Sequence, residues 1–327
     1  MKKVFSLILA LGLIASLTAC GGGNASGNET GDSAPAASTA KLRFVTGGES
    51  GTYYAFGGVL ASFVSGKSNC KVTALTSGGS QANVEDLTNG NVQLAFVQSD
   101  VMNYAYNGQR LFDSPVTGFS VVAQLYQEQV QIVTTNPDIK TVADLAGKKV
   151  SIGAAGSGVY FNAIDVLSAY DLKESDISAV YQSFGDSAES LKDGKIDAAF
   201  TVAGAPTTAI VDYATTNTLN LVSLTDEELA AIQEAYPFLI RDDLPSTTYT
   251  GMTGDVVCVA IQATLVASEE LSEDVVYEFV KAMFDNKDAL TEGHAKFGFL
   301  DPEAASAGAT VTMHPGAEKY YKEIGVL

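Results

Sequence analysis

Basic and metal-binding side chains are scarce in this sequence. It contains 19 Lys and Arg residues against 38 Asp and Glu residues, and it has only two histidines and three cysteines. A formal net charge of −19 argues against nucleic acid as a partner, because contacts to phosphates need clustered Lys and Arg. His294 and His314 lack the spacing of zinc ligands, so we expect neither a metal nor a cofactor.

Enzyme signatures are also missing. Ser157 stands in Ala155-Gly156-Ser157-Gly158, which is not the Gly-x-Ser-x-Gly pattern of a nucleophile elbow. Gly147-Lys148 and Gly194-Lys195 lack the upstream glycine and the following Ser or Thr of a phosphate-binding loop. Acidic pairs such as Asp242-Asp243 indicate solvated surface more than paired catalytic carboxylates. We therefore predict a binding protein and not an enzyme, with an extracytoplasmic enzyme on the same scaffold as the less favoured alternative.

Long apolar runs are confined to the N-terminus. Lys2 and Lys3 precede an apolar stretch from Val4 to Leu17, and Thr18-Ala19-Cys20 follows it. About 14 apolar residues are too few to span a bilayer, and small residues before Cys20 suit a processing peptidase, so the pattern predicts an export signal over residues 1–19. It resembles a bacterial lipoprotein signal, which implies a lipid on Cys20, and an ordinary secretory signal is the alternative.

The segment after the signal has no large apolar side chain to bury. Residues 20–40 are therefore expected to form a flexible, lipid-anchored linker. About 287 residues remain, enough for two domains, and we expect no further membrane span. Removing the signal takes away two lysines and changes the net charge from −19 to −21, which favours solubility. We expect a monomer outside the cytoplasm, held at the cell surface or in the periplasm by its lipid.

Two thiols remain after Cys20. Cys70 and Cys258 could pair in an oxidising compartment, or they could stay buried and free. One potential disulfide in so long a chain is not a disulfide framework, so the sequence leaves both possibilities open.

Short apolar strands alternate with helix-length segments from Leu42 onward, which predicts an α/β protein. The expected strands are Leu42–Thr46, Lys71–Thr76, Val92–Gln98, Val130–Thr134, Lys149–Gly153, Ala179–Gln182, Ile196–Val202 and Val256–Ile261. The expected helices are Tyr53–Val64, Ala82–Asn89, Val142–Ala146, Val159–Tyr170, Ala188–Lys192, Thr207–Thr215, Asp226–Tyr236 and Ser272–Asp285. Thr225 and Glu228 have the spacing of a capping box before the helix at Asp226.

Two stretches of the chain repeat in the same order at nearly the same offset. Ser50-Gly51-Thr52-Tyr53 recurs as Ser157-Gly158-Val159-Tyr160, in each case between a strand and a helix. A later pattern of Leu, Gly, an aliphatic residue, Ala and Phe, from Leu87 to Phe96, recurs from Leu191 to Phe200. Such matches can arise by chance between α/β units, but two in order favour two similar lobes.

Four small polar loops follow expected strands and lead into expected helices: Gly47–Thr52, Ser77–Ser80, Gln98–Asp100 and Ala154–Gly158. Ligands of open α/β sheets bind at such positions, where helix N-termini present unpaired N–H groups. No arginine lies in these loops, so a small anion would be held mainly by N–H groups and hydroxyls. The candidate ligand-binding residues are Gly48, Gly51, Thr52, Tyr53, Gly79, Ser80, Asn83, Gln98, Ser99, Ser157, Gly158 and Val159, with Tyr53 favoured over Tyr54.

The run Gly47-Gly48-Glu49-Ser50-Gly51-Thr52-Tyr53-Tyr54 resembles the opening motif of the TAXI family, the extracytoplasmic receptors of one class of TRAP transporters. The similarity extends from about Leu42 to the C-terminus. Further stretches that match this pattern in order are Ser80-Gln81-Ala82-Asn83-Val84, Gln98-Ser99-Asp100, Asp144-Leu145-Ala146-Gly147-Lys148-Lys149-Val150, Ala155-Gly156-Ser157-Gly158 and His314-Pro315-Gly316-Ala317.

This resemblance implies a type II periplasmic-binding-protein fold, in which two α/β lobes are joined by two hinge strands and enclose the ligand. The crossings would be Gln124–Gln131 and Thr247–Val257, so that lobe I comprises residues 41–125 plus 252–327 and lobe II residues 126–251. The ligand would be a small organic acid such as glutamate, glutamine or a related dicarboxylate, and the partner an integral-membrane permease driven by an ion gradient.

Three points stay open at this stage. The Gly-Ser-Gly motif of the family usually continues with Thr, where this chain has Val159, so a hydroxyl that could touch the ligand is absent. His314 could serve as a turn and cap residue or have a functional role. A receptor of an ABC importer would share the fold and the lipid anchor, and it is the alternative to a TRAP receptor.

Overall fold

The computed structural model describes residues 39–308 and 310–327. The predicted signal (residues 1–19), the lipidation site Cys20 and the linker up to residue 38 lie outside the described residues. None of the helices within residues 39–308 and 310–327 is long and apolar enough to cross a bilayer.

The strands of the described chain form one mixed sheet in the order β2-β1-β3-β10-β4-β7-β5-β6, with β8 paired to β4 and β9 to β10. Their bounds are β1 (Ala40–Val45), β2 (Cys70–Leu75), β3 (Leu94–Gln98), β4 (Phe119–Thr134), β5 (Lys149–Ser151), β6 (Ser178–Val180), β7 (Ala198–Ala203), β8 (Asn220–Leu221), β9 (Ile240–Arg241) and β10 (Val259–Ser268). The α/β class predicted from the sequence is confirmed.

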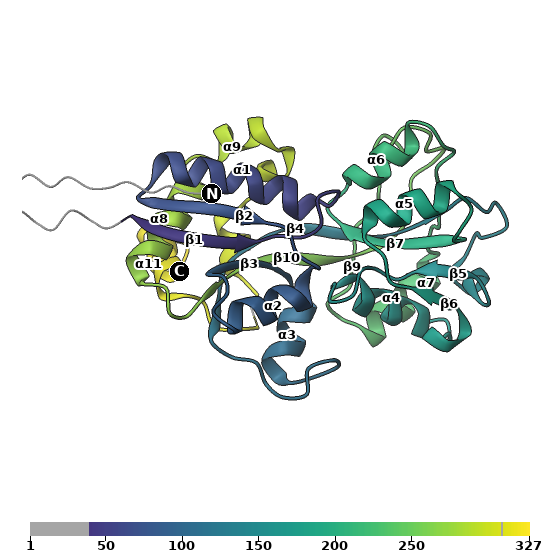
Figure 1. Cartoon of the computed structure of the whole chain (residues 1–327), viewed down its shortest axis with the longest axis horizontal. Coiled ribbons are helices and arrows are strands. Elements are labelled where there is room, and N and C mark those ends of the chain that lie inside the picture. The colour runs from purple at the N-terminus through teal and green to yellow at the C-terminus, as the bar shows by residue number, and fades with distance from the viewer. Residues whose placement is uncertain (1–38, 309) are drawn as a thin grey trace, which may run out of the picture. The chain divides into compact units, whose positions relative to one another are not determined.

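Helices cover both faces of this sheet (Figure 1). The α-helices are α1 (Thr52–Lys67), α2 (Ser80–Thr88), α3 (Ser99–Asn107), α4 (Val159–Ser168), α5 (Phe184–Lys192), α6 (Thr208–Ala214), α7 (Asp226–Ala235), α8 (Glu273–Phe284), α9 (Lys287–Gly293), α10 (Pro302–Ser306) and α11 (Pro315–Glu323). Short 3-10 helices lie at η1 (Val142–Leu145), η2 (Glu174–Asp176) and η3 (Ala295–Phe299).

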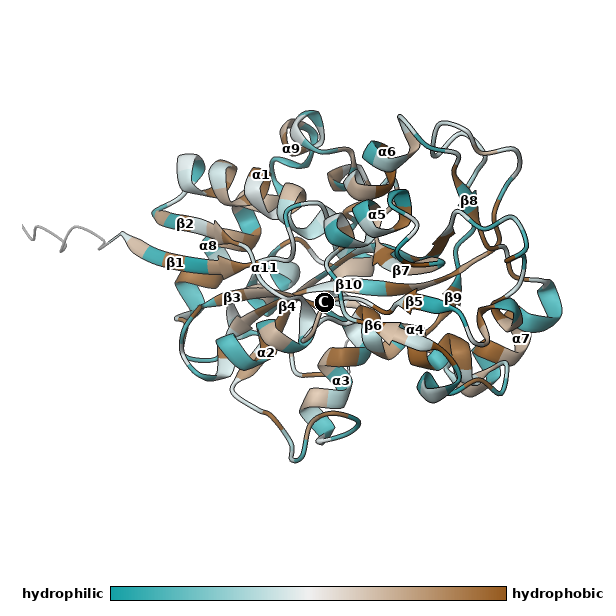
Figure 2. Cartoon of the chain, turned by 45° about the vertical axis from the view of Figure 1, so that its right-hand side comes forward, coloured by the Kyte–Doolittle hydropathy of each residue, from teal (hydrophilic) through white to brown (hydrophobic). Residues whose placement is uncertain are grey.

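The apolar side chains divide into two sets, which define two lobes. The first set is drawn mainly from Leu42–Tyr126 and Ala263–Tyr321, and packs α1, α8, α9 and α11 on one face of the sheet and α2 and α3 on the other. The second set is drawn from Val130–Ile261, with α4 and α7 on one face and α5 and α6 on the other. Figure 2 shows hydrophobic residues concentrated along β3 of the first lobe and β7 of the second.

The two lobes repeat one topology. The first lobe begins β1-α1-β2-α2-β3 with parallel pairing of β1 to β2 and to β3, and the second begins β5-α4-β6-α5-β7 with parallel pairing of β5 to β6 and to β7. Gly90 and Gly194, at matching places in the repeated sequence pattern, both adopt a positive φ, 72° and 65°. A residue with a Cβ is strained in this conformation, which explains the repeated glycine. The predicted similarity of the two halves is confirmed.

Two long strands pass through both lobes. β4 pairs with β10 along most of its length and with β7 at its C-terminal end, while β10 also pairs with β3. The first predicted crossing, Gln124–Gln131, lies within β4. The second, Thr247–Val257, contains no strand, because Val256 forms only an isolated bridge to Leu244 and packs with the second lobe. The second crossing is instead β10, so Met252, expected to begin the return to lobe I, belongs with the second lobe.

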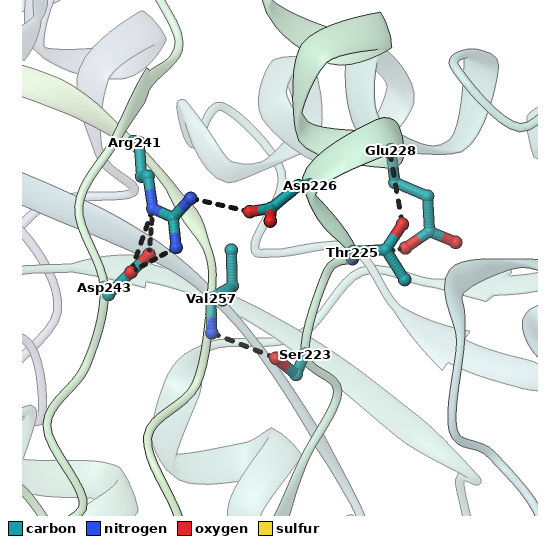
Figure 3. Close-up of polar contacts among 7 residues, drawn as sticks. All are labelled: Ser223, Thr225, Asp226, Glu228, Arg241, Asp243 and Val257. Atoms are coloured by element: carbon teal, nitrogen blue, oxygen red, sulfur yellow. Dashed lines mark hydrogen bonds and ion pairs between the residues drawn. The ribbon is translucent and has the colours of Figure 1, made fainter.

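Several local predictions can be checked directly. Thr225 and Glu228 form the expected capping box at the start of α7, in the cluster of polar contacts drawn in Figure 3. In the same cluster Arg241 forms ion pairs with Asp226 and Asp243, and Ser223 accepts a hydrogen bond from the Val257 amide. These groups lie on the surface of the second lobe and play a local structural part.

The structure distinguishes the alternatives that the sequence left open for His314 and for the two cysteines. His314 caps α11, since its Nδ1 accepts a hydrogen bond from the Gly316 amide, 3.1 Å away. Cys70 and Cys258 are buried free thiols, one in the core of each lobe.

Candidate ligand-binding site

A cleft lies where the two lobes face each other beside β4 and β7. It holds about 610 Å³ of space between atoms, part of which is open to solvent. Its lining comes from the first lobe, from β4, and from the second lobe: Gly47, Gly48, Ser50, Gly51, Thr52, Tyr53, Ser77, Gly78, Gly79, Ser80, Gln98, Glu128, Ala154, Ser157, Gly158, Val159, Ser183, Phe184, Val202 and Ala203. A ligand in this cleft would touch both lobes at once.

Three helices begin at this cleft, each after a glycine. The N-cap residues of α1, α2 and α4 are Gly51, Gly79 and Gly158, and none of these helices has a side chain that caps its first turn. Glycine offers no side-chain acceptor, so the first N–H groups depend on other partners. Three convergent helix N-termini supply both donors and positive partial charge, an arrangement that favours an anionic group.

Most of the predicted site residues come together in the cleft. Ten of them line it: Gly48, Gly51, Thr52, Tyr53, Gly79, Ser80, Gln98, Ser157, Gly158 and Val159. Tyr54 does not, which agrees with the preference for Tyr53.

Asn83 and Ser99 do not line the cleft. The Asn83 amide donates to the backbone carbonyls of Thr46, at 2.8 Å, and Phe96, at 2.7 Å, so it ties the ends of β1 and β3 together beneath the cleft. Ser99 is the first residue of α3, which follows β3 without a loop and turns it away from the lining. Asn83 therefore supports the site from outside it, and Ser99 takes no part in the lining.

Sequence reasoning did not find Glu128, which lies in the middle of β4 and forms part of the cleft wall. Its side chain is 2% exposed, and Oε2 accepts a hydrogen bond of 2.6 Å from the Tyr53 hydroxyl. Burial raises the pKa of Glu128 to about 8, although the Tyr53 hydrogen bond opposes this rise. The pKa of Tyr53 is raised as well, by its own burial and by the charge of Glu128.

Glu128 is the one charged residue among the described lining residues. The basic side chain whose charge lowers the pKa of Glu128 is Lys296 of η3. Lys296 lies outside the lining, and its Nζ is 5.7 Å from the centroid of the Tyr126 ring. Burial lowers the pKa of Lys296. A ligand in the cleft therefore meets helix N-termini, hydroxyls and one carboxyl group, and no basic side chain.

Two buried polar atoms of the lining have no hydrogen-bond partner among the residues that the structure describes. They are Oε1 of Gln98, whose side chain is 2% exposed, and Oγ of Ser157, which is 6% exposed. An unpartnered buried polar group costs stability, so a site that leaves two such groups in one cleft is built for a polar occupant.

The lobes already touch around this cleft. The Thr52 hydroxyl donates to the carbonyl of Gly204 at 2.6 Å, and the Ala82 amide donates to the carbonyl of Gly156 at 3.0 Å. Gly158 approaches the first lobe so closely that a Cβ there would lie 1.5 Å from Oε1 of Gln98. The structure is therefore a closed form, in which a side chain at position 158 would have to displace the buried Gln98 side chain.

A polar and aromatic contact extends the closure beyond the cleft. The Gln98 amide donates to Oδ1 of Asn162 at 3.0 Å, and the Asn162 amide donates to Oδ2 of Asp100 at 2.7 Å. Phe161 of α4 packs into the core of the first lobe, where its ring stacks with those of Tyr104 and Phe112. Burial raises the pKa of Asp100 to about 7.

The remaining lining residues that the sequence did not single out come from the second lobe. Ser183 and Phe184 follow β6 as Ser77–Ser80 follow β2, and Val202 and Ala203 end β7 as Gln98 ends β3. The repeat between the lobes could have identified these positions, because a glycine follows each of them, Gly185 after Phe184 and Gly204 after Ala203.

Solved structures with similar folds are two-lobed binding proteins. A protein of Bordetella bronchiseptica RB50 aligns with 88% of this chain and 89% of its own, with 16% identity and a TM-score of 0.52. An ancestral arginine-binding protein bound to arginine aligns with 78% and 98%, at 15% identity and 0.51. A putative L-cystine ABC transporter protein from Listeria monocytogenes aligns with 79% and 95%, at 14% identity and 0.50. The predicted periplasmic-binding-protein fold, with two lobes, is confirmed.

Within this fold class the chain belongs to the NMT1-like family, whose pattern matches residues 44–325. That match covers nearly all of the described chain. It does not single out the TAXI receptors, so membership of that narrower group stays a prediction from the motifs.

Proposed function

We propose that this protein is an extracytoplasmic solute-binding protein, which captures a small organic ligand by closure of its two lobes and delivers it to a membrane importer. The observation that carries this proposal is the cleft itself, where α1 and α2 of the first lobe and α4 of the second begin at uncapped glycines. Binding there would join the lobes, and a ligand that contacts both lobes favours the closed form over the open one.

The ligand is proposed to carry a carboxylate. Its negative charge would lie against the first N–H groups of the three helices, with the hydroxyls of Ser80 and Ser157 as further donors. Recovery of the bound compound chemically unchanged would distinguish this receptor from an enzyme on the same scaffold.

The partner is proposed to be an ABC importer. Structural similarity supports this alternative better than the TRAP permease that the TAXI motifs suggest, because the similar Listeria protein is described as a putative L-cystine ABC transporter. The measurement that separates the two is uptake in membrane vesicles that contain the transporter. Uptake that requires ATP and survives collapse of the ion gradients supports an ABC partner, and the reverse result supports a TRAP permease.

Export and lipid anchoring at Cys20 are proposed from the sequence pattern alone. Replacement of Cys20 by Ser in the full chain should release the protein from the membrane fraction. Continued membrane association of that variant would contradict the anchor.

The function is tested first by a thermal-unfolding screen of the purified protein against amino acids, keto acids, dicarboxylates and sugars. A ligand that binds the native state raises the melting temperature, by about 2.7 kcal/mol of stabilisation at a concentration of 100 Kd. Substitution of Ser80 by a bulky residue should abolish the shift while the protein remains folded. A shift that survives in this variant would contradict the site.

A further inference from the structure

Glu128 lies where it can contact a ligand, at a position where the packing of the protein does not require a charge. It forms part of the cleft wall, on a strand that runs through both lobes, and it is the one charged side chain among the described lining residues. The Tyr53 hydroxyl donates a hydrogen bond to Oε2 of Glu128, while Oε1 of Glu128 accepts no hydrogen bond from any residue that the structure describes. Oε1 is also not among the fully buried unpartnered atoms. The free oxygen is therefore available to the cleft.

We propose that Glu128 determines specificity, and that its Oε1 accepts hydrogen bonds from a protonated amino group of the ligand while the ligand carboxylate lies at the N-termini of α1, α2 and α4. This inference rests on the proposed function. It narrows the ligand class from organic acids in general to amino acids, since a dicarboxylate or keto acid offers no cation to this carboxyl group.

The charges around the cleft agree with a zwitterion. Helix N-termini present positive partial charge, and Glu128 presents the one carboxyl group among the described lining residues. The two charges of a zwitterion cancel each other, so the ionised Glu128 carboxyl leaves one negative charge in the complex, which faces the positive partial charges of the helix N-termini. A ligand with two carboxylates would place one of them beside Glu128 with no basic lining residue to compensate.

Binding of an ammonium group would be coupled to a proton. With a pKa of about 8, Glu128 is largely protonated at neutral pH in the empty protein, and it binds an ammonium group more strongly after it has lost that proton. The groups that face it are Tyr53 of α1, Asp100 of α3, Lys296 of η3 and Tyr126 of β4. Amino-acid affinity should therefore rise as the pH increases from 6 to 8, with release of a proton on binding.

The experiment is calorimetric titration of the wild-type protein with amino acids and with analogues that lack the amino group. The sets are L-glutamate with α-ketoglutarate and glutarate, L-alanine with pyruvate and propionate, and L-leucine with its own keto and desamino analogues. The expected result is one amino acid that binds about 100-fold more tightly than both of its analogues. An analogue that binds as tightly as the amino acid overturns the role of Glu128 but leaves the solute-binding function standing. Absence of binding by every compound counts against both.

Glu128→Gln tests the same residue with its shape preserved. This variant should lose about 100-fold in amino-acid affinity and lose the rise with pH, while the affinity for the analogues changes little. Glu278→Gln makes the same change on the exposed face of α8, far from the lining, and should behave as wild type. If Glu128→Gln does not fold, the pH dependence of the wild type decides: tighter binding at lower pH overturns the proposal.

Discussion

The guanidinium of Arg110 lies 2.6 Å from Oδ1 of Asp165 and joins the two lobes outside the cleft. Arg110 follows α3 of the first lobe, and Asp165 lies on α4 of the second, where its side chain is 1% exposed. Burial raises the pKa of Asp165, and Arg110 opposes that rise. The closed form therefore buries a carboxylate whose basic partner, among the residues that the structure describes, is Arg110 of the other lobe.

Arg110→Ala should weaken ligand binding without a comparable loss in the stability of either lobe. Loss of a hydrogen bond to a charged group costs about 1.5–3 kcal/mol, and here that cost falls on the closed form. Affinity for the ligand found by screening should fall about 10- to 100-fold in calorimetry. Arg241→Ala is the control, because Arg241 pairs with Asp226 and Asp243 inside the second lobe. Equal affinities for both variants would show that the Arg110 pair does not hold the closed form.

Gly158→Ala should block closure. The added Cβ would lie 1.5 Å from Oε1 of Gln98 and 2.9 Å from Oγ of Ser80, so the lobes could keep their present distance only if these buried side chains moved. We expect loss of ligand binding and, in X-ray scattering with ligand, a larger radius of gyration than wild type. The matched change Gly66→Ala, at a helical position with open space around it, should keep full affinity. Binding by Gly158→Ala at wild-type strength would refute the closed geometry.

The free energy of unfolding should decrease as the pH rises from 6.5 to 8. Glu128 and Asp100 keep their protons in the folded protein up to pH values of about 8 and about 7, whereas the unfolded chain releases them near its ordinary values of 4.5 and 3.8. The folded state then binds more protons through these two groups, so the stability that they contribute is fully present below their unfolded values and is lost as the pH rises through the raised pKa values.

The measurement is chemical denaturation of the ligand-free protein across this pH range. His294 and His314, whose pKa values are lowered by burial, act below about pH 6.5 and so leave this range clear. Glu128→Gln should reduce the slope by as much as about 1 kcal/mol per pH unit. An unchanged slope would mean that Glu128 is already ionised at pH 6.5.

Neither thiol of the folded part should react with a thiol reagent in the native state. Burial raises the pKa of both Cys70 and Cys258, and the thiolate is the reactive form. In protein that begins at residue 39, we expect no labelling in buffer and two labelled thiols per chain in denaturant. Labelling of neither thiol under denaturing, non-reducing conditions would indicate a disulfide between the lobes.

The loops of the cleft were predictable because they depend on local sequence. A strand that ends in Gly-rich polar residues before a helix presents N–H groups at that point. Gly51, Gly79 and Gly158 are the residues that indicate such helix starts in the sequence. The partner of each loop across the cleft was not predictable. Gly158 lies close against Gln98 of the other lobe, and no local pattern contains that contact.

The long strand β4 shows where local reasoning fails. The apolar pattern predicted only Val130–Thr134, because the glutamines and Glu128 from Gln124 to Gln131 interrupt it, and the hinge strand at Gln124–Gln131 was expected only from the family resemblance. In the structure these polar groups find partners far away in the sequence: the Gln131 amide donates to Thr207 Oγ1 at 3.1 Å, and Gln129 Oε1 accepts from the Ala205 amide at 2.8 Å. Helix α3 was missed for a related reason, since it begins directly after β3 in residues that resemble a loop.

The path of β4 and β10 also determines when each lobe can be completed during synthesis. The core of the second lobe is contiguous, from Val130 to Ile261, so every residue it needs exists once Ile261 has been added. The core of the first lobe needs Tyr320 and Tyr321 of α11, a few residues from the C-terminus. Domains fold as units, so the lobe that begins the chain is the last to fold, and its apolar strands must wait exposed until the final helix arrives.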